Sequence, residues 1–178
     1  MNWSAEQRAA RVRALILDVD GVLTDGGLLY HANGESKIFN VRDGHGIVLA
    51  RLAGLRTAFL TGRASEAVRR RAAELKIDAL REGVYRKGEA LDELLRALDV
   101  QPEHVCYAGD DLVDLAVLRR VGFPAAPADA VPEVRDAAAW VATRPGGNGA
   151  VRELVEFILK SQGVWADIVR RHEREQYP

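Results

Sequence analysis

The chain has little cysteine, little excess charge of one sign and no long apolar run. A single cysteine, Cys106, in 178 residues excludes an internal disulfide bond and a zinc site built from several thiolates. The 25 Lys and Arg residues nearly balance the 26 Asp and Glu residues. The resulting net charge of −1 argues against a general affinity for nucleic acid or for anionic membranes.

No apolar run approaches the ~18 residues that would span a bilayer. Asp18 and Asp20 also stand where a signal peptide would need apolar residues. We therefore expect a cytoplasmic protein with no membrane partner and no nucleic-acid partner. With 48% hydrophobic and 29% charged residues and no linker-like segment, residues 1–178 are expected to form a single domain with a buried core.

Short apolar runs alternate with longer amphipathic stretches along the chain. This alternation is typical of βαβ units and predicts an α/β fold with a doubly wound, mostly parallel sheet. Residues 13–19 form a continuous apolar run, as expected for a strand that is covered on both faces. Further strands are predicted at 56–60, 77–80, 104–108, 122–128 and 138–143, the last two at the sheet edge, and helices at 44–53, 64–76, 87–98, 111–120 and 150–162.

One stretch, residues 26–41, departs from this pattern. It carries two alternating apolar runs around Asn33-Gly34, and such a pair between such runs is the strongest short-range signal for a β-hairpin. We expect a hairpin inserted after the first strand, with an apolar face of Leu28, Tyr30, Ile38 and Phe39. Because an isolated hairpin is only marginally stable, this face must pack on something, and a partner subunit is a good candidate.

Polar motifs follow four of the predicted strands. They are DVDGVLTD from Asp18 to Asp25, Thr61-Gly62-Arg63, Lys87 at the start of a helix, and GDDLVD from Gly109 to Asp114. Ligands of doubly wound sheets bind at the carboxyl ends of the strands, where these motifs would meet. Several carboxylates buried together require positive charge, so their convergence implies a divalent cation.

These four motifs, in this order, resemble those of the haloacid dehalogenase superfamily of phosphotransferases. The resemblance implies a Rossmann-like core and a Mg2+ ion held by the Asp18 carboxylate, the backbone carbonyl of Asp20 and the Asp110 carboxylate. It also implies that Asp18 attacks phosphorus to form an aspartyl-phosphate, and that Asp20 is the general acid and base. Thr61 and Lys87 would stabilise the phosphoryl oxygens, while Asp111 and Asp114 would orient water or Lys87.

A cation between nucleophile and substrate is also required on electrostatic grounds. A phosphate monoester is a dianion, and two like unit charges at 4 Å repel by ~4 kcal/mol at an effective dielectric constant of 20. A bridging Mg2+ removes this repulsion and orients the phosphoryl oxygens.

Many members of the superfamily insert a cap domain over the active site, and this sequence has no room for one. The hairpin and one helix already fill the interval from Asp18 to Thr61. The interval from Thr61 to Lys87 holds only one helix and one strand. An uncapped site is open, so either the substrate is large or a neighbouring subunit closes the site.

Longer segments of the sequence resemble those of the 3-deoxy-D-manno-octulosonate 8-phosphate phosphatases, a branch of the superfamily without a cap domain. The segments that carry this resemblance are DVDGVLTDG, ESKIFNVRDGHGI, TGR, GDDLVDLAVLRRVG and GGNGAVREL. It implies a sugar-phosphate substrate from lipopolysaccharide precursor synthesis, a homotetramer formed through the hairpin, and a C-terminal tail, about 163–178, that reaches a neighbour's site. The substrate-binding residues that it implies are Asp20, Asn40, Val41, Arg42, Asp43, Gly44, Arg63, Arg71 and Lys87.

Three other interpretations compete with this one. The first is a phosphatase for the 9-phosphate of a nine-carbon keto-acid sugar, although such relatives tend to carry an acidic residue where Arg63 stands. The second is a phosphoacceptor domain like a response-regulator receiver. In receivers, however, the acidic pair lies on the first strand and the phosphorylated Asp on the third. The third is a catalytically silent homologue, which the intact motifs disfavour.

Overall fold

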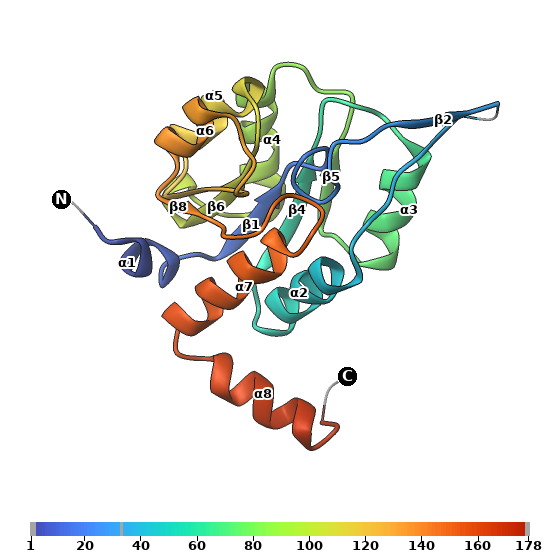
Figure 1. The fold of residues 1–178 in the computed structure, drawn as a ribbon. Coiled ribbons are helices and arrows are strands. Elements are labelled where there is room, and N and C mark those ends of the chain that lie inside the picture. The colour runs from blue at the N-terminus through green and yellow to red at the C-terminus, as the bar shows by residue number, and fades with distance from the viewer. Residues whose placement is uncertain (1–2, 33, 177–178) are drawn as a thin grey trace.

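A six-stranded β-sheet forms the centre of the protein in the computed structural model, which describes residues 3–32 and 34–176. The strands lie in the order β5-β4-β1-β6-β7-β8, and every neighbouring pair is parallel (Figure 1). The order runs outward from β1 in both directions, so the predicted doubly wound sheet is confirmed. The strand bounds are β1 Ala14–Leu17, β4 Arg56–Leu60, β5 Ala79–Arg81, β6 Val105–Ala108, β7 Phe123–Ala126 and β8 Trp140–Val141.

Helices cover both faces of the sheet and enclose two apolar clusters. Because side chains alternate along a strand, Leu15 and Leu17 of β1 point into one cluster, and Ala14 and Ile16 point into the other. The first face is covered by α1 (Ala5–Ala9), α2 (Val41–Leu52), α3 (Glu66–Glu74) and α7 (Ala150–Ser161); the second is covered by α4 (Lys87–Leu98), α5 (Leu115–Leu118) and α6 (Pro132–Ala137).

The register of the central strands brings the polar motifs to one edge. Leu17, the last residue of β1, lies opposite Phe59 of β4 and opposite Ala108, the last residue of β6. Because the three strands are parallel, the segments that begin at Asp18, Thr61 and Gly109 leave the sheet on the same side.

The inserted hairpin is confirmed. Strands β2 (Leu29–His31) and β3 (Gly34–Ser36) pair in antiparallel fashion and project from the body of the protein (Figure 1). Asn33 of the predicted turn lies outside the described residues. Tyr30 and Ile38 are 66% and 80% exposed, as expected for an unpaired apolar face. Phe39, in contrast, packs against the first apolar cluster and under the guanidinium of Arg71.

The strand predicted at 122–128 is present as β7, but its predicted position at the sheet edge is wrong, because β7 lies between β6 and β8. The carbonyl of Pro124 in β7 accepts a hydrogen bond from the N–H of Ala139, the residue before β8, 2.8 Å away. A residue's N–H and C=O point to the same neighbouring strand, so the N–H that proline lacks is missing only on the side of the two-residue β8. The proline is therefore tolerated inside the sheet.

Four helical segments differ from the sequence-based expectation. Helices α1 and α6 were not predicted, and α8 (Trp165–Glu173) occupies the segment expected to be a C-terminal tail. The helix predicted at 111–120 is shorter, with a 3-10 turn at Leu112–Asp114 followed by α5. In α8 only Ile168 is buried, so the apolar face is too narrow to be recognised as periodic.

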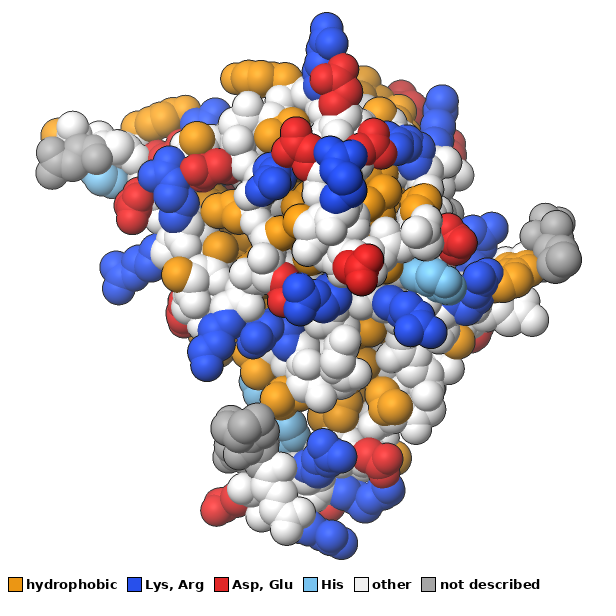
Figure 2. Space-filling model, turned by 180° about the vertical axis from the view of Figure 1, so that it is seen from behind, with side chains coloured by type: hydrophobic (Ala, Val, Ile, Leu, Met, Phe, Trp, Pro, Cys, Tyr) orange, Lys and Arg blue, Asp and Glu red, His pale blue; other side chains and the backbone are white. Residues whose placement is uncertain are grey.

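The surface carries charges of both signs. Basic and acidic side chains stand beside one another over much of the face seen in Figure 2, with apolar side chains between them. Ion pairs bring some of these charges together, as between Arg81 and Glu93, whose Nε and Oε2 atoms are 2.9 Å apart. Within residues 3–32 and 34–176, no helix has both the length and the apolar character needed to cross a bilayer.

Candidate active site

A cavity of about 350 Å³ opens at the carboxyl edge of the central strands. It gathers residues from all four of the polar motifs, which are far apart in the sequence. The residues predicted for catalysis and metal binding therefore share one cavity, together with one predicted substrate-binding arginine. These lining residues are Asp18, Asp20, Thr61, Arg63, Lys87, Asp110 and Asp111.

The loop after β1 fixes the position of Asp18. The Asp18 N–H donates to Ala108 O of β6, 3.0 Å away, and its Oδ1 accepts from Val19 N at 2.7 Å. Gly21 has a φ of +83°, and a Cβ there would lie 2.0 Å from Asp110 Oδ2. Only glycine combines this conformation with so close an approach to a site carboxylate.

A second loop, around Gly146 and Gly147, braces the loop after β1. Gly147 N donates to Val22 O at 2.9 Å. A Cβ on Gly146 would lie 1.8 Å from Gly21 O, and Gly147 has a φ of +64°. The two glycines thus let a late segment of the chain pack directly on the backbone that carries Asp18 and Asp20.

Lys87, the first residue of α4, lies between two buried carboxylates. Its Nζ is 2.6 Å from Asp18 Oδ2 and 2.7 Å from Asp114 Oδ1. Asp114 Oδ2 accepts from the backbone N–H groups of Asp110 and Asp111, at 2.9 and 3.2 Å. The hydroxyl of Tyr107 also donates to Asp114 Oδ1. Asp114 therefore orients Lys87, which is one of the roles that the resemblance implies for it.

The site holds more carboxylate groups than basic groups to compensate them. Burial raises the pKa of Asp18 to about 7, against the opposing effect of Lys87, and the charge of Asp114 adds to the rise. Burial, with the charges of Asp18 and Asp114, also raises the pKa of Asp110 to about 7. The pKa of Lys87 is raised because the two carboxylates outweigh the effect of its burial. One lysine does not neutralise this group.

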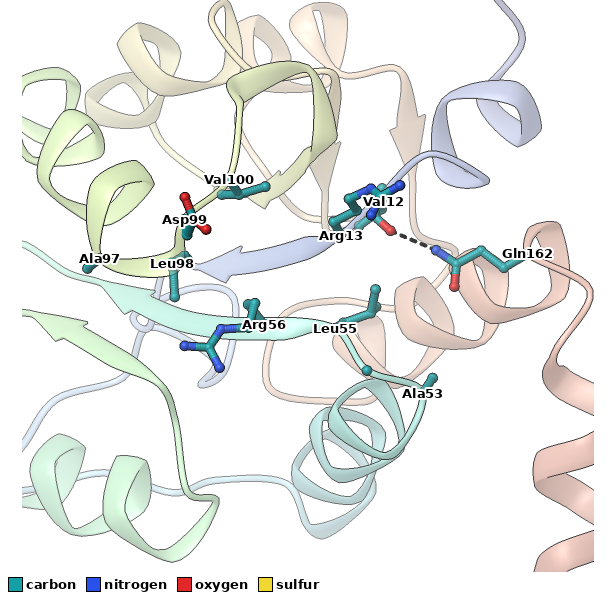
Figure 3. A pocket seen from close by; sticks show the side chains of 11 residues that line it. Val12, Arg13, Ala53, Leu55, Arg56, Ala97, Leu98, Asp99, Val100 and Gln162 are labelled. Atoms are coloured by element: carbon teal, nitrogen blue, oxygen red, sulfur yellow. Dashed lines mark hydrogen bonds between the residues drawn. The ribbon is translucent and has the colours of Figure 1, made fainter.

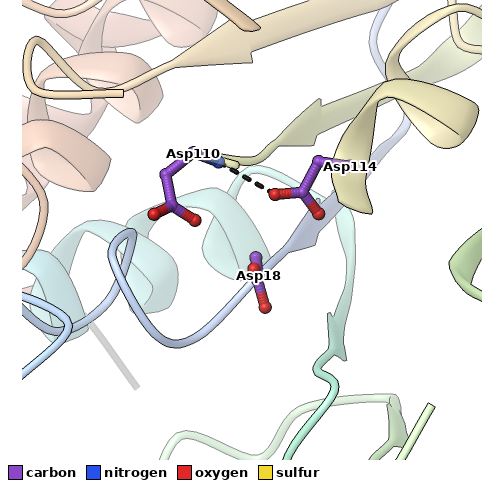
Figure 4. A group of neighbouring side chains, drawn as sticks. All are labelled: Asp18, Asp110 and Asp114. Atoms are coloured by element: carbon purple, nitrogen blue, oxygen red, sulfur yellow. Dashed lines mark hydrogen bonds between the residues drawn. The ribbon is translucent and has the colours of Figure 1, made fainter. Parts of the chain in front are cut away.

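This arrangement fits a divalent cation. Oxygen atoms of Asp18, Asp110 and Asp114 lie within 4.8 Å of one another (Figure 4). Asp114 is already engaged by its donors, which leaves Asp18 and Asp110 as the carboxylates able to bind an ion. A set of carboxylate oxygens suits a hard ion such as Mg2+.

The hairpin contributes charged residues that sequence analysis did not single out. Lys37, whose side chain is fully buried, pairs with Asp20 Oδ1. Glu35 Oε2 accepts from Arg63 Nη2 at 2.7 Å, and the Tyr30 hydroxyl accepts from the same nitrogen at 3.1 Å. Positions 35 and 37 share one face of an extended chain. This period of two in charged residues is the sequence signal that could have assigned Glu35 and Lys37 to the site.

The predicted substrate-binding segment 40–44 lies outside the cavity of the single chain. Asn40 caps α2 by accepting from Arg42 N at 2.8 Å. The buried Asp43 caps α7 by accepting from Gly149 N and Arg152 N, at 3.0 and 2.8 Å. Val41 and Arg42 are exposed, and Gly44 packs against Arg71, whose Nη2 donates to Asn40 O at 3.3 Å. The role of these residues in substrate binding stays a prediction.

A larger hollow of about 560 Å³ lies at the opposite, amino-terminal edge of the strands (Figure 3). Arg13, Leu55, Val100 and Gln162 are among its lining residues, and Gln162 Nε2 donates to Val12 O at 2.8 Å. Among the described residues that line this hollow, Asp99 is the only acidic one. These residues form no cluster of catalytic groups, and we assign the candidate active site to the cavity at the carboxyl edge.

Comparison with known proteins agrees with this geometry. A family model described as haloacid dehalogenase-like hydrolase matches residues 80–154. The 3-deoxy-D-manno-octulosonate 8-phosphate phosphatase KdsC of Escherichia coli strain K12 is 45% identical over 157 residues, which cover 88% of this chain and 84% of that protein.

Two solved structures share the fold over nearly the whole chain. The Moraxella catarrhalis 3-deoxy-D-manno-octulosonate 8-phosphate phosphatase, in complex with magnesium ion, phosphate ion and KDO, superimposes with a TM-score of 0.91 and 37% identity, covering 94% of this chain and 97% of that one. The cobalt-bound phosphatase of Haemophilus influenzae gives a TM-score of 0.88 and 42% identity, covering 90% and 94%.

The parallel sheet and the carboxylate cluster at its edge, with the matching family model, define an enzyme of the haloacid dehalogenase-like hydrolase class. Within that class, the identity to the Escherichia coli protein shows that the chain belongs to the 3-deoxy-D-manno-octulosonate 8-phosphate phosphatase family.

Proposed function

We propose that this protein is a Mg2+-dependent phosphatase that hydrolyses 3-deoxy-D-manno-octulosonate 8-phosphate to the free sugar acid and phosphate. The observation that carries the proposal is the position of Asp18. Its buried carboxylate lies 2.6 Å from Lys87, in a cavity that also contains Thr61 and Asp110. The proteins to which the chain is similar are named for this activity, and one of them holds magnesium, phosphate and KDO.

In the first half of the reaction Asp18 attacks phosphorus. A bond forms between an Asp18 oxygen and phosphorus, and the bond between phosphorus and the sugar oxygen breaks. Asp20, two residues further on, gives its proton to the departing alkoxide. In the second half Asp20 takes a proton from water, which attacks phosphorus and releases phosphate from Asp18.

Lys87 and Thr61 stabilise the charge on the phosphoryl oxygens during both halves. Asp18 and Asp110, with the backbone carbonyl of Asp20, would hold the Mg2+ ion. When bound, this ion supplies positive charge that offsets the repulsion between carboxylate and phosphate dianion. Asp111 and Asp114 orient the surrounding groups, and Asp114 does so through its contact with Lys87.

Arg63 supports a sugar acid as the substrate. It lines the cavity, and a guanidinium suits bidentate recognition of a carboxylate. Arg71 contacts Asn40 and Gly44 at the amino end of α2, and the predicted substrate-binding residues there are Asn40, Val41, Arg42, Asp43, Gly44 and Arg71. We propose that they contact the sugar in the assembled enzyme.

We also propose that residues 1–178 act as one phosphatase domain, which works as a homotetramer in the cytoplasm. Support for the assembly comes from the exposed apolar side chains of the hairpin. Leu29, Tyr30 and Ile38 are 62%, 66% and 80% exposed, and burial of such side chains favours association. The segment after Gly163, which forms α8, would reach towards a neighbouring subunit.

The test is a phosphate-release assay over sugar phosphates, with Mg2+ and with EDTA. We expect the eight-carbon keto-acid 8-phosphate to be the best substrate by kcat/KM, and no release in the presence of chelator. Faster hydrolysis of a nine-carbon 9-phosphate would assign the alternative substrate. Equal rates on simple hexose phosphates would contradict the proposed specificity, and undiminished rates in EDTA would contradict the metal requirement.

A further inference from the structure

Tyr107 is a buried polar residue to which the mechanism above gives no part. It lies in β6, where the whole side chain is buried in the apolar cluster beneath α4 and α5. Its neighbours in the strand are the buried Cys106 and Ala108, which bring no polar group to the interior. Packing alone is satisfied by a phenyl ring, so the hydroxyl needs a separate explanation.

The hydroxyl donates to Asp114 Oδ1, the same oxygen that lies 2.7 Å from Lys87 Nζ. The other Asp114 oxygen accepts two backbone N–H groups, from Asp110 and Asp111. Four donors therefore hold one carboxylate that is fully buried. Lys87 Nζ is in turn 2.6 Å from Asp18 Oδ2. Tyr107 is thus connected to the nucleophile through two side chains.

We propose that the Tyr107 hydroxyl is a positioning group for phosphoryl transfer, which acts through Asp114 to hold Lys87 against Asp18. This inference rests on the proposed function only in its use of Asp18 as nucleophile; it does not depend on the identity of the sugar. Asp114 is fully buried, and loss of a hydrogen-bond donor to a buried carboxylate is costly. When the hydroxyl is removed, Asp114 and Lys87 therefore settle in a new arrangement, and the ammonium no longer faces the phosphoryl oxygens correctly.

Tyr107→Phe tests this inference, with Thr57→Val as the matched control. Thr57 is also buried, lies on β4, which β1 separates from β6, and donates its hydroxyl to a carboxylate, Asp78 Oδ2, at 3.1 Å. It is near the amino end of its strand, however, away from the site. Both variants delete one buried hydroxyl without a change in backbone, so thermal unfolding of the two serves as a measure of the purely structural effect.

We expect Tyr107→Phe to lower kcat by about 10- to 100-fold with little change in KM, as is usual when a group that orients a ligand-binding residue is removed. Thr57→Val should keep the wild-type kcat. A wild-type kcat in Tyr107→Phe, or an equal loss in both variants, would overturn the inference. So would a loss confined to KM, because the proposed contact acts on the chemical step.

A binding measurement separates this inference from the proposed function. Beryllofluoride mimics a phosphoryl group on a carboxylate, so its Mg2+-dependent affinity reports on the Asp18 and Lys87 arrangement without turnover. Tyr107→Phe should bind it more weakly than Thr57→Val does. If the wild type hydrolyses no sugar phosphate, the proposed function fails while this comparison still decides the role of Tyr107. Equal affinity in the two variants would contradict that role.

Discussion

Lys87 is the residue that connects the polar motifs. Its ammonium group lies between Asp18 and Asp114, and its side chain is only 2% exposed. Buried charges of one sign are tolerated only when they are paired and hydrogen-bonded. Burial, together with neighbouring carboxylates that one lysine does not offset, raises the pKa of Asp110. The same excess of negative charge in the three clustered carboxylates fits a divalent cation.

Substitution of Asp18 and substitution of Asp20, the two aspartates of the first motif, are expected to affect turnover differently when the leaving group of the substrate changes. Asp18→Asn should abolish turnover of every phosphate ester, because the nucleophile is gone. Asp20→Asn should lower kcat for a sugar phosphate by about 100- to 10,000-fold, the range for a general acid. With p-nitrophenyl phosphate only the first half should be spared, since nitrophenolate leaves without a proton, while hydrolysis of the aspartyl-phosphate still needs Asp20. The variant should therefore release a stoichiometric burst of nitrophenolate, seen by absorbance after rapid mixing, before a slow steady state. Steady-state phosphate release with Mg2+ measures turnover by both variants.

Thermal unfolding of the two variants is the control for this comparison, because both substitutions keep the shape of the side chain. Near-normal turnover of a sugar phosphate by either folded variant would contradict the assigned roles.

Arg63 is expected to act on substrate binding. Arg63→Ala should raise KM for the keto-acid sugar phosphate by about 10- to 100-fold, as a lost charged hydrogen-bond pair predicts. KM for p-nitrophenyl phosphate, which has no carboxylate, should stay the same. Arg63→Lys retains the charge but not the bidentate geometry. Its KM for the keto-acid sugar phosphate should therefore lie between those of the wild type and Arg63→Ala. An equal rise of KM for both substrates would show that Arg63 does not recognise the carboxylate.

At the scale of elements, the segment after the hairpin joins two helices. Asn40 starts α2, and Asp43, in the first turn of α2, closes the amino end of α7. A carboxylate at this place satisfies backbone N–H groups and interacts favourably with the helix dipole. Residues that the resemblance assigns to substrate binding thus also cap two helices and stabilise the fold.

Asp43→Ala should therefore lower the free energy of unfolding by about 2 kcal/mol, because it leaves two N–H groups of α7 without their acceptor. Chemical denaturation at neutral pH measures this loss. Asp43→Asn keeps one acceptor oxygen and should lose less. Unchanged stability with a raised KM would instead assign Asp43 to the substrate alone.

The contact between α2 and α8 should make stability depend on pH. The His45 and His172 rings meet edge to face with centroids 5.7 Å apart. Burial, together with the charges of Arg152 and His172, lowers the pKa of His45. The neutral form is therefore favoured in the folded state. The stability that depends on it is present above ~6.5, the unfolded-state pKa, and is lost as the pH falls below that value.

His45→Gln removes this titration. Between pH 7.5 and pH 5.5 the urea midpoint of the wild type should fall more than that of the variant. An identical fall in both proteins would show that His45 does not contribute.

The sequence predicted the central strands and the motifs at their ends because both depend on local patterns. A continuous apolar run marks β1, and Asp18 follows it directly. Tyr107 was not recognised as part of the site, since one tyrosine within the run HVCYA looks like any core residue. Its hydroxyl acquires a role only when α4 brings Lys87 to Asp114. Lys37 was missed for the same reason, because its partner Asp20 is brought near by the return of the hairpin.

At the scale of the whole molecule, the projecting hairpin has few contacts with the rest of the chain and leaves apolar side chains exposed. It contacts the body through Lys37, Glu35 and Tyr30, while Ile38 and Leu29 face solvent. An isolated two-stranded hairpin is marginally stable. The proposed homotetramer would cover its apolar side chains.

Ile38→Lys combined with Leu29→Ser should therefore reduce the number of subunits in the assembly, because a charge and a hydroxyl replace apolar contact area. Light scattering coupled to size-exclusion chromatography measures the mass. Leu52→Ser, a change at a 38% exposed apolar residue at the end of α2, is the control and should leave the mass unchanged. A wild-type protein that is monomeric at micromolar concentration would contradict the assembly.

The brace formed by Gly146 and Gly147 bears on when the enzyme becomes active during its synthesis. The aspartates of the first loop leave the ribosome early, yet the backbone that supports this loop from behind is translated late. In a nascent chain Asp18, the proposed nucleophile, therefore stands on a segment without this support until Gly147 has left the ribosome and its N–H has bonded to Val22 O.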